Sequence, residues 1–117
     1  MKVLCYSKCN TCRKALKYLD DHEIRYEHRD IKEENPSAEE LRDWIRQSGL
    51  SSRKFFNTSG KLYKEMELSK KLADMSEEEQ IRLLASDGML VKRPLLIKED
   101  TVLVGFKEPE WEELLVK

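Results

Sequence analysis

The order of hydrophobic patterns along the chain predicts an α/β fold with one four-stranded mixed sheet. We expect a βαβ unit at the start, a ββα unit at the end and a helical insertion between these two halves. Three observations support this expectation: an amphipathic helical repeat directly after a β-prone run, two capping boxes in mid-chain, and two strand-like runs near the end. The length suits a single domain, 1–117, with the insertion at about 36–88.

The βαβ unit comes first. Residues 2–6 form an apolar run typical of a strand, residues 10–21 repeat with helical spacing, and residues 24–30 alternate like a second strand. Two strands joined through a helix run parallel, so this unit predicts a parallel pair. The positions expected to face inward are Cys12, Ala15, Leu16 and Leu19 in the helix, and Ile24, Tyr26 and His28 in the second strand.

Two capping boxes define the insertion. Ser37 with Glu40 and Ser76 with Glu79 each place a hydroxyl and a carboxylate where they can bond the free N–H groups of a first helical turn. The other assignments are helix ends at Gly49 and Asp87-Gly88, a loop at 50–61 anchored by Phe55-Phe56, a short or irregular helix at 62–73, and buried faces at Leu41, Trp44, Ile45, Ile81, Leu84 and Ala85.

The ββα unit closes the chain. Residues 94–98 and 101–106 are apolar runs separated by Glu99-Asp100, a gap short enough for a β-hairpin. Pro109 suits the first turn of a final helix. That helix is expected to turn Trp111, Leu114 and Leu115 inward.

The charge balance bears on partners. Lys plus Arg is 22 and Asp plus Glu is 23, which gives a net charge of −1 and none of the basic excess of a general nucleic-acid binder. No apolar stretch approaches the roughly 20 residues that cross a bilayer, and the N-terminus lacks a signal-peptide pattern. We therefore expect a cytoplasmic monomer that contacts neither membrane nor nucleic acid directly.

The chemistry is expected at Cys9 and Cys12, a CxxC pair where the first strand turns into the first helix. The positive end of the helix, with Lys8 and Arg13 nearby, favours a thiolate at Cys9. Cys12 lies one turn further on, along the apolar stripe. This placement predicts Cys9 as the attacking thiolate and Cys12 as the semi-buried resolving thiol.

A zinc site is the alternative for a CxxC pair, and it needs two further ligands. The candidates are Cys5, His22 and His28, none of which belongs to a second paired motif, so we favour redox chemistry. Cys5 lies within the first predicted strand. We interpret it as a small apolar core residue.

Four stretches carry a family resemblance: YSKCNTCRKALKYL at 6–19, FFNTSGKLYKEM at 55–66, LLASDGMLVKRPLL at 83–96 and VGFKEPEWEE at 104–113. In these the chain resembles the arsenate-reductase/Spx family of thioredoxin-like proteins. The resemblance implies a thioredoxin-like fold, catalysis by Cys9, and a cis-proline at Pro94 whose neighbour Arg93 adds positive charge and can bind an oxyanion. The residues expected to bind substrate are Lys8, Asn10, Thr11, Arg13 and Pro94.

Two departures from the family's glutaredoxin-coupled arsenate reductases affect the expected substrate. Those enzymes use two further arginines around the oxyanion, and the matching places here fall near Asn57 and Phe106, neither of which is cationic. They also commonly lack the second cysteine, which this chain has as Cys12. We therefore expect weak arsenate reduction at most, since charge-assisted hydrogen bonds are the strong ones.

Two functions remain open. We favour a thiol–disulfide oxidoreductase of the arsenate-reductase-like, glutaredoxin-like type. It would hold no bound cofactor, with glutathione, another thiol donor, or a glutaredoxin or thioredoxin system as redox partner. The alternative is an Spx-like redox-sensing regulator. It would use the same cysteine pair as a switch and bind the RNA polymerase alpha subunit.

Overall fold

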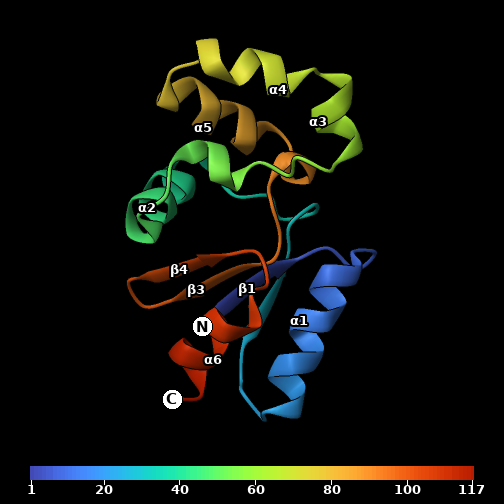
Figure 1. Ribbon diagram of the computed structural model, residues 1–117, viewed down its shortest axis with the longest axis vertical. Helices are drawn as coiled ribbons and strands as arrows, with labels where there is room; N and C mark the ends of the chain where they lie inside the picture. Colours follow the sequence, from blue (N-terminus) through green and yellow to red (C-terminus); the bar gives the residue numbers. More distant parts are fainter.

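The computed structural model describes residues 1–117 and has a four-stranded sheet with α1 and α6 on one face and the helices of the insertion on the other (Figure 1). The strands are β1 (Lys2–Cys5), β2 (Glu27–Asp30), β3 (Leu95–Lys98) and β4 (Thr101–Val104). The helices are α1 (Asn10–Asp21), α2 (Ala38–Ser48), α3 (Lys61–Glu65), α4 (Leu68–Lys71), α5 (Glu77–Ser86) and α6 (Glu108–Leu115). Three short 3-10 turns, η1 (Ser52–Phe55), η2 (Leu72–Asp74) and η3 (Gly88–Leu90), lie among the helices of the insertion.

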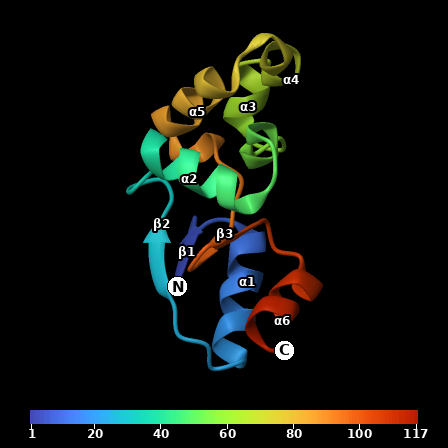
Figure 2. The same cartoon turned by 90° about the vertical axis from the view of Figure 1, so that its left-hand side faces the viewer.

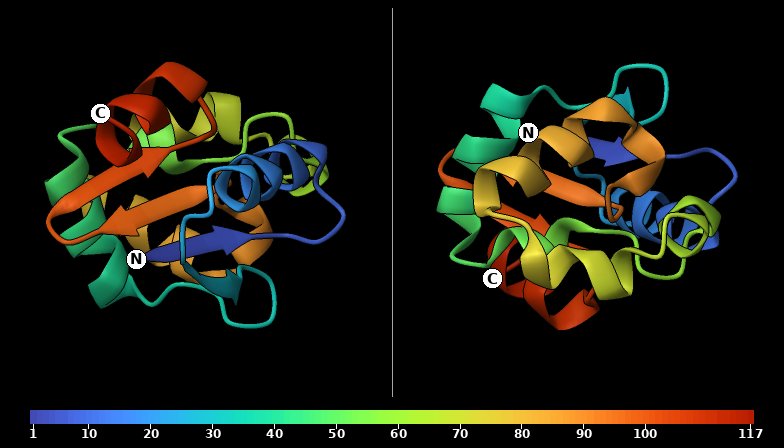
Figure 3. Two further views of the ribbon diagram at one scale, coloured as in Figure 1. Left: turned by 90° about the horizontal axis from the view of Figure 1, so that it is seen from below. Right: turned by 90° about the horizontal axis from the view of Figure 1, so that it is seen from above.

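The sheet is mixed, as the sequence predicted. Its strand order is β2-β1-β3-β4, which Figure 3 shows from below. β1 and β2 are parallel, which confirms the βαβ unit, and β3 pairs antiparallel with both β1 and β4. β1 therefore occupies a central position, and the chain leaves its end directly into the cysteine pair.

The two faces of the sheet have separate cores. Alternation along β1 turns Val3 and Cys5 towards α1 and α6, while Leu4 points to the insertion. Figure 2 shows α1 and α6 on one side of the sheet, and the insertion helices lie on its other face. The first helix thus starts beside the border between the sheet and the insertion.

The capping boxes are present as predicted. The Ser37 hydroxyl accepts from the Glu40 N–H, and the Glu40 carboxylate accepts from the Ser37 N–H; Ser76 and Glu79 repeat this arrangement. Gly49 ends α2 with φ of 72°, a left-handed conformation that glycine adopts without strain. These local signals fixed both helix starts.

Some predicted inward positions are wrong. His28 is exposed, because β2 is the edge strand and only part of it is covered. The regular strand also begins later than predicted, at Glu27 instead of residue 24. Leu16 and Ala85, also expected to face inward, are half-buried and pack against the cores, and Tyr18 and Gln80 are buried in the same helices.

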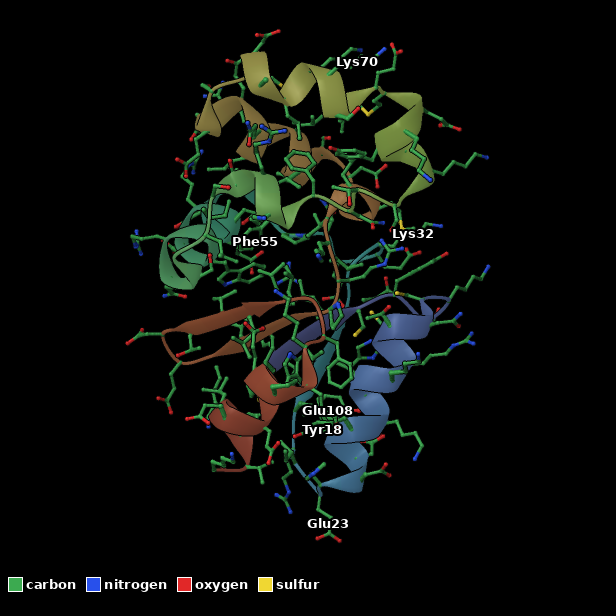
Figure 4. All side chains as sticks on the ribbon, in the orientation of Figure 1. Tyr18, Glu23, Lys32, Phe55, Lys70 and Glu108 are labelled. Carbon is green, nitrogen blue, oxygen red and sulfur yellow. The ribbon has the colours of Figure 1, made fainter.

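The loop after α2 anchors the insertion to the sheet half. Phe55 and Phe56 are buried, as predicted, and Phe55 lies on the insertion side of the sheet (Figure 4). The Lys92 N–H donates to the Phe55 carbonyl at 2.7 Å, and the Asn57 N–H donates to the Leu90 carbonyl at 2.8 Å. These bonds hold the loop beside the segment that enters β3.

None of the helices combines the length and the apolar character that a membrane crossing requires.

Candidate functional site

Cys9 is the N-cap residue of α1, as the sequence predicted. Its N–H donates to the Tyr6 carbonyl at 3.0 Å, and its own carbonyl accepts the first helical bond from Arg13 N–H at 3.0 Å. The Cys9 side chain makes no capping bond and is partly exposed. The free N–H groups of the first turn therefore face a sulfur that substrate can reach.

Cys12 is a different kind of thiol, because only 1% of it is exposed. It packs beneath α1 with Ala15 and Leu19. The Tyr6 N–H donates to the Cys12 sulfur at 3.4 Å. One thiol of the pair is thus partly exposed and the other is enclosed.

The proton affinity of Cys12 is not that of an ordinary buried thiol. Its pKa is lowered from 9.0 to about 7, first by a hydrogen bond from the Cys5 thiol and further by the Tyr6 N–H, by Cys9 and by the charge of Arg93. Burial opposes this shift. The same hydrogen bond, together with burial, raises the pKa of Cys5 far above its ordinary range.

The Arg93–Pro94 peptide bond is cis, as the resemblance implied. Pro94 is buried, and its carbonyl accepts from the Gly105 N–H at 2.8 Å, where β4 ends. The Arg93 guanidinium lies over the Tyr6 ring, 5.2 Å from its centre. Its Nε and Nη1 groups are buried without any hydrogen-bond partner in the protein.

A cavity of about 410 Å³ joins these elements. It brings together the start of α1, the loop at 57–60, the segment before β3 and the segment after β4. Gly105 has a φ of 80°, so the chain turns there in a left-handed conformation that favours glycine. The lining residues are Cys9, Thr11, Asn57, Ser59, Gly60, Lys92, Arg93, Gly105, Phe106 and Lys107.

The cavity is cationic. Lys92, Arg93 and Lys107 line it, no carboxylate does, and none of these three cations takes part in an ion pair. In a chain with a net charge of −1, this local excess of positive charge creates a region that attracts anions. The arrangement can bind an anionic group beside a reactive sulfur.

The structure brings together some of the residues expected at the site. Cys9, Thr11 and Arg93 line the cavity, whereas Cys12 and Pro94 are buried and do not line it. Lys8, Asn10 and Arg13 are exposed and outside the lining, and the Arg13 Nε donates to the Ser7 carbonyl at 3.1 Å.

Sequence reasoning missed Lys92 and Lys107. Asn57 and Phe106 do lie in the cavity, at the places inferred for the two absent family arginines. Lys92 immediately precedes Arg93, and Lys107 immediately follows Phe106. A search for cations next to those positions would have found both lysines.

The zinc candidates are dispersed. His28 is exposed on the edge strand, and the His22 Nδ1 lies 2.8 Å from the Tyr18 carbonyl at the other end of α1. Histidine, cysteine and acidic side chains form no group of three or more arranged for a metal ion. All three cysteines are free thiols in this structure.

The fold is that of the thioredoxin-like proteins, with a cysteine pair at the start of the first helix and a cis-proline before the third strand. Within that class the chain belongs to the ArsC family, which matches residues 4–114. The uncharacterized protein YusI of Bacillus subtilis is 54% identical over 108 residues, 92% of either chain. The global transcriptional regulator Spx of the same organism is 28% identical over 107 residues, 92% of this chain and 80% of Spx.

Solved structures agree with this assignment. An ArsC-family-related protein from Bacteroides fragilis has a TM-score of 0.94 and 57% identity, covering 97% of this chain and 95% of the other. A chain described as a possible arsenate reductase from Streptococcus mutans has a TM-score of 0.84 and 47% identity, covering 91% and 90%.

Proposed function

We propose that this protein is a thiol–disulfide oxidoreductase that reduces anionic disulfides. The Cys9 thiolate attacks one sulfur of the substrate disulfide, the S–S bond breaks, and the first substrate thiolate leaves. Cys12 then attacks the Cys9 sulfur and releases the second substrate thiol. The substrate gains two electrons and the protein is left with a Cys9–Cys12 disulfide.

The observation that carries this proposal is the contrast between the two sulfurs. Cys9 opens onto the cavity, and Cys12 is enclosed with a pKa of about 7. The optimum attacking thiol has a pKa near the ambient pH, so Cys12 is well suited to an internal displacement at neutral pH. A buried structural cysteine would have no need of that property.

The positive charges of the cavity favour an anionic substrate. Lys92, Arg93 and Lys107 line the cavity and can attract carboxylates that flank a substrate sulfur. A mixed disulfide of glutathione or of a similar acidic thiol has this chemistry. Glutathione, another small thiol, or a glutaredoxin or thioredoxin system would then supply two electrons to restore the reduced pair.

Arsenate is a weaker candidate substrate. It would have to be bound by Arg93 and the two lysines, because Asn57 and Phe106 occupy the places of the family's further arginines. Lysine is a point charge and lacks the bidentate geometry of arginine. We therefore expect little turnover of arsenate with glutathione and glutaredoxin.

A trapping experiment tests the proposed function. In Cys12→Ser, a mixed disulfide between Cys9 and a glutathionylated substrate should accumulate, as measured by intact mass and peptide mapping. In the unchanged protein the same reaction should end in a Cys9–Cys12 disulfide, and Cys9→Ser should react no faster than buffer. Labelling at Cys5, or no trapped adduct, would contradict the proposal.

A second candidate is an Spx-like regulator, favoured by the similarity to Spx along 92% of this chain. In that case the Cys9–Cys12 disulfide would be a switch, and the partner would be the RNA polymerase alpha subunit. Equilibrium binding of purified alpha subunit to the reduced and the oxidised chain tests this candidate. A redox-dependent affinity would favour the regulator, and no binding in either state would exclude it.

A further inference from the structure

A second cavity adjoins the one that contains Cys9, and it is built mainly from the insertion. Its volume is about 470 Å³. Lys92 lines both cavities and is the one residue that they share. The proposed reaction uses the first cavity alone, so the second is left without a role. Its lining residues are Ser51, Arg53, Lys54, Phe56, Thr58, Tyr63, Leu72 and Lys92.

The loop after η1 forms the wall between the two cavities. Phe56 and Thr58 line the second cavity, whereas Asn57 and Ser59 line the first. This loop pairs through its backbone with the segment that enters β3, and Figure 1 shows the two side by side. Lys92 belongs to that segment and reaches both cavities. A ligand that follows Lys92 can therefore pass from Cys9 over the loop into the second cavity.

The two cavities share one sign of charge. The second adds Arg53 and Lys54 to the cations of the first, and no carboxylate lines either cavity. Arg53 and Lys54 are exposed, and neither takes part in an ion pair. In a chain with 23 acidic residues and a net charge of −1, this arrangement creates one extended region of positive potential. The region continues from the thiol to the insertion.

The floor of the second cavity is apolar and its rim is polar. Phe56, Tyr63 and Leu72 are buried beneath it, and the two aromatic rings are 6.3 Å apart. Ser51 and Thr58 add exposed hydroxyl-bearing residues to the rim. An apolar floor under a charged rim suits a side chain with a methylene stem and an anionic end, such as glutamate. Bases need exposed aromatic faces to stack on, and these rings are at most 8% exposed, so a nucleic acid fits less well.

We propose that the second cavity is a subsite for acidic side chains of a polypeptide substrate, close in sequence to the cysteine whose disulfide is reduced at Cys9. That the occupant belongs to the substrate rests on the proposed function. An extended chain advances about 3.3 Å per residue, so a segment that crosses the loop places its carboxylates a few residues from the disulfide. Clusters of cationic residues recognise acidic motifs in this way. Arg53 and Lys54 then select the substrate and leave the chemical steps at Cys9 and Cys12 unchanged.

A pair of matched peptides tests the subsite. Each carries one cysteine in a mixed disulfide with glutathione, and the residues that flank this cysteine are glutamate in one peptide and glutamine in the other. The unchanged protein should reduce the glutamate peptide with a kcat/KM about tenfold higher at low ionic strength, as three exposed ion pairs would give. The difference should lie in KM, because the subsite does not touch the reacting atoms, and it should shrink in high salt.

Two double variants locate this preference. Arg53→Gln with Lys54→Gln removes two of the three cations of the second cavity, and the preference should fall to about twofold. Lys2→Gln with Arg25→Gln removes the same charge from exposed positions near the start of β1, at the opposite end of that strand from the cysteine pair. This control should keep the tenfold preference.

A binding measurement separates the subsite from the redox chemistry. A fluorescent glutamate peptide with serine in place of cysteine cannot react, and its dissociation constant is measured by anisotropy. The constant should rise about fivefold in Arg53→Gln with Lys54→Gln and stay the same in the control variant. A single-stranded oligonucleotide of equal charge should displace this peptide poorly.

The outcomes distinguish the two proposals. Reduction of both peptides without a preference overturns the subsite and leaves the proposed function intact. Failure to reduce either peptide, with the serine peptide still bound through Arg53 and Lys54, overturns the proposed function and supports an acidic-peptide site. No reduction and no binding overturn both. An equal loss in the control variant, or displacement by the oligonucleotide at equal concentration, overturns the subsite, because net charge alone would then explain the binding.

Discussion

The two cores of this protein differ in size and in chemistry. The insertion-side core has 17 buried residues and no cysteine, whereas the α1-side core has 8, of which two are Cys5 and Cys12. Burial of apolar area scales with stability, so most of the folding free energy should come from the insertion side. The reactive sulfurs are confined to the smaller core.

The two regions meet at the segment that leads into β3. The loop of the insertion pairs with the backbone on both sides of Val91, and Arg93 follows two residues later at the edge of the cavity. The insertion therefore contributes to the site through its backbone and through Asn57, Ser59 and Gly60. We infer that side-chain changes deep in the insertion affect stability, and that changes around the thiols affect rates.

The largest expected effect is on stability. Phe55 is fully buried in the insertion-side core, and Phe55→Ala should lower the free energy of unfolding by about 3–5 kcal/mol. Urea denaturation measures this change. The fraction that remains folded should alkylate at Cys9 as fast as the unchanged protein.

Leu50, which is 44% exposed in the same loop region, provides the control. Leu50→Ala should change the free energy of unfolding by no more than about 0.5 kcal/mol. If folded Phe55→Ala lost its Cys9 reactivity, the division between the two cores would be wrong.

The features that could be predicted from the sequence are mostly local. The capping boxes at Ser37 and Ser76 act within one helical turn, and both helices start where predicted. Cys9 at the start of a helix is equally local, since a strand and a helical repeat flank it. The prediction that His28 faces inward was wrong, because its burial depends on whether β2 has a neighbouring strand on both sides, and β2 is an edge strand.

The burial of Cys5 and Cys12 in one core could not be predicted in this way. Val3, Leu4 and Cys5 are all apolar, so alternation does not reveal which of them faces the helix. Cys5 is buried, as the sequence predicted, and it lies in the same core as Cys12. The cavity lysines depend in the same way on segments that only the folded chain brings together.

A smaller effect is expected at Arg93, on the reactive side. Its Nε and Nη1 have no partners in the protein, so Arg93→Met should leave thermal stability nearly unchanged. Loss of hydrogen bonds to a charged substrate group, about 1.5–3 kcal/mol, should lower kcat/KM for a glutathione mixed disulfide by at least about tenfold. The Arg93 charge also lowers the pKa of Cys12, so the resolving step should shift to higher pH.

A neutral dialkyl disulfide is the matched substrate for this variant. Without carboxylates it should be reduced by Arg93→Met and by the unchanged protein at similar rates at pH values above the pKa of Cys12. An equal loss with both substrates would mean that Arg93 does not bind the anion. High salt should reduce the difference between the two substrates in the unchanged protein.

The smallest expected effect concerns an ion pair that joins the sheet to the insertion, away from the thiols. Arg29 on β2 donates from Nη1 and Nη2 to the Glu40 carboxylate on α2, at 2.6 and 2.8 Å. These bonds lower the pKa of Glu40 from 4.5 to about 2, against burial and with help from the Ser37 N–H. A carboxyl whose pKa is lowered by folding stabilises the protein at pH values above its ordinary pKa. That contribution is lost as the pH falls from 4.5 to about 2.

Glu40→Gln keeps the capping geometry at Ser37 but cannot ionise. Its free energy of unfolding at neutral pH should fall by about 1 kcal/mol, since a partly exposed pair contributes less than a buried one. Between pH 4.5 and about 2 the variant should lose less stability than the unchanged protein, and the two curves should converge. Glu39→Gln removes an exposed charge from the same helical turn and is the control, expected to follow the unchanged protein. The free energy of unfolding is measured by urea denaturation at each pH. If it fell equally in Glu40→Gln and in the unchanged protein between pH 4.5 and about 2, the ion pair would not stabilise this junction.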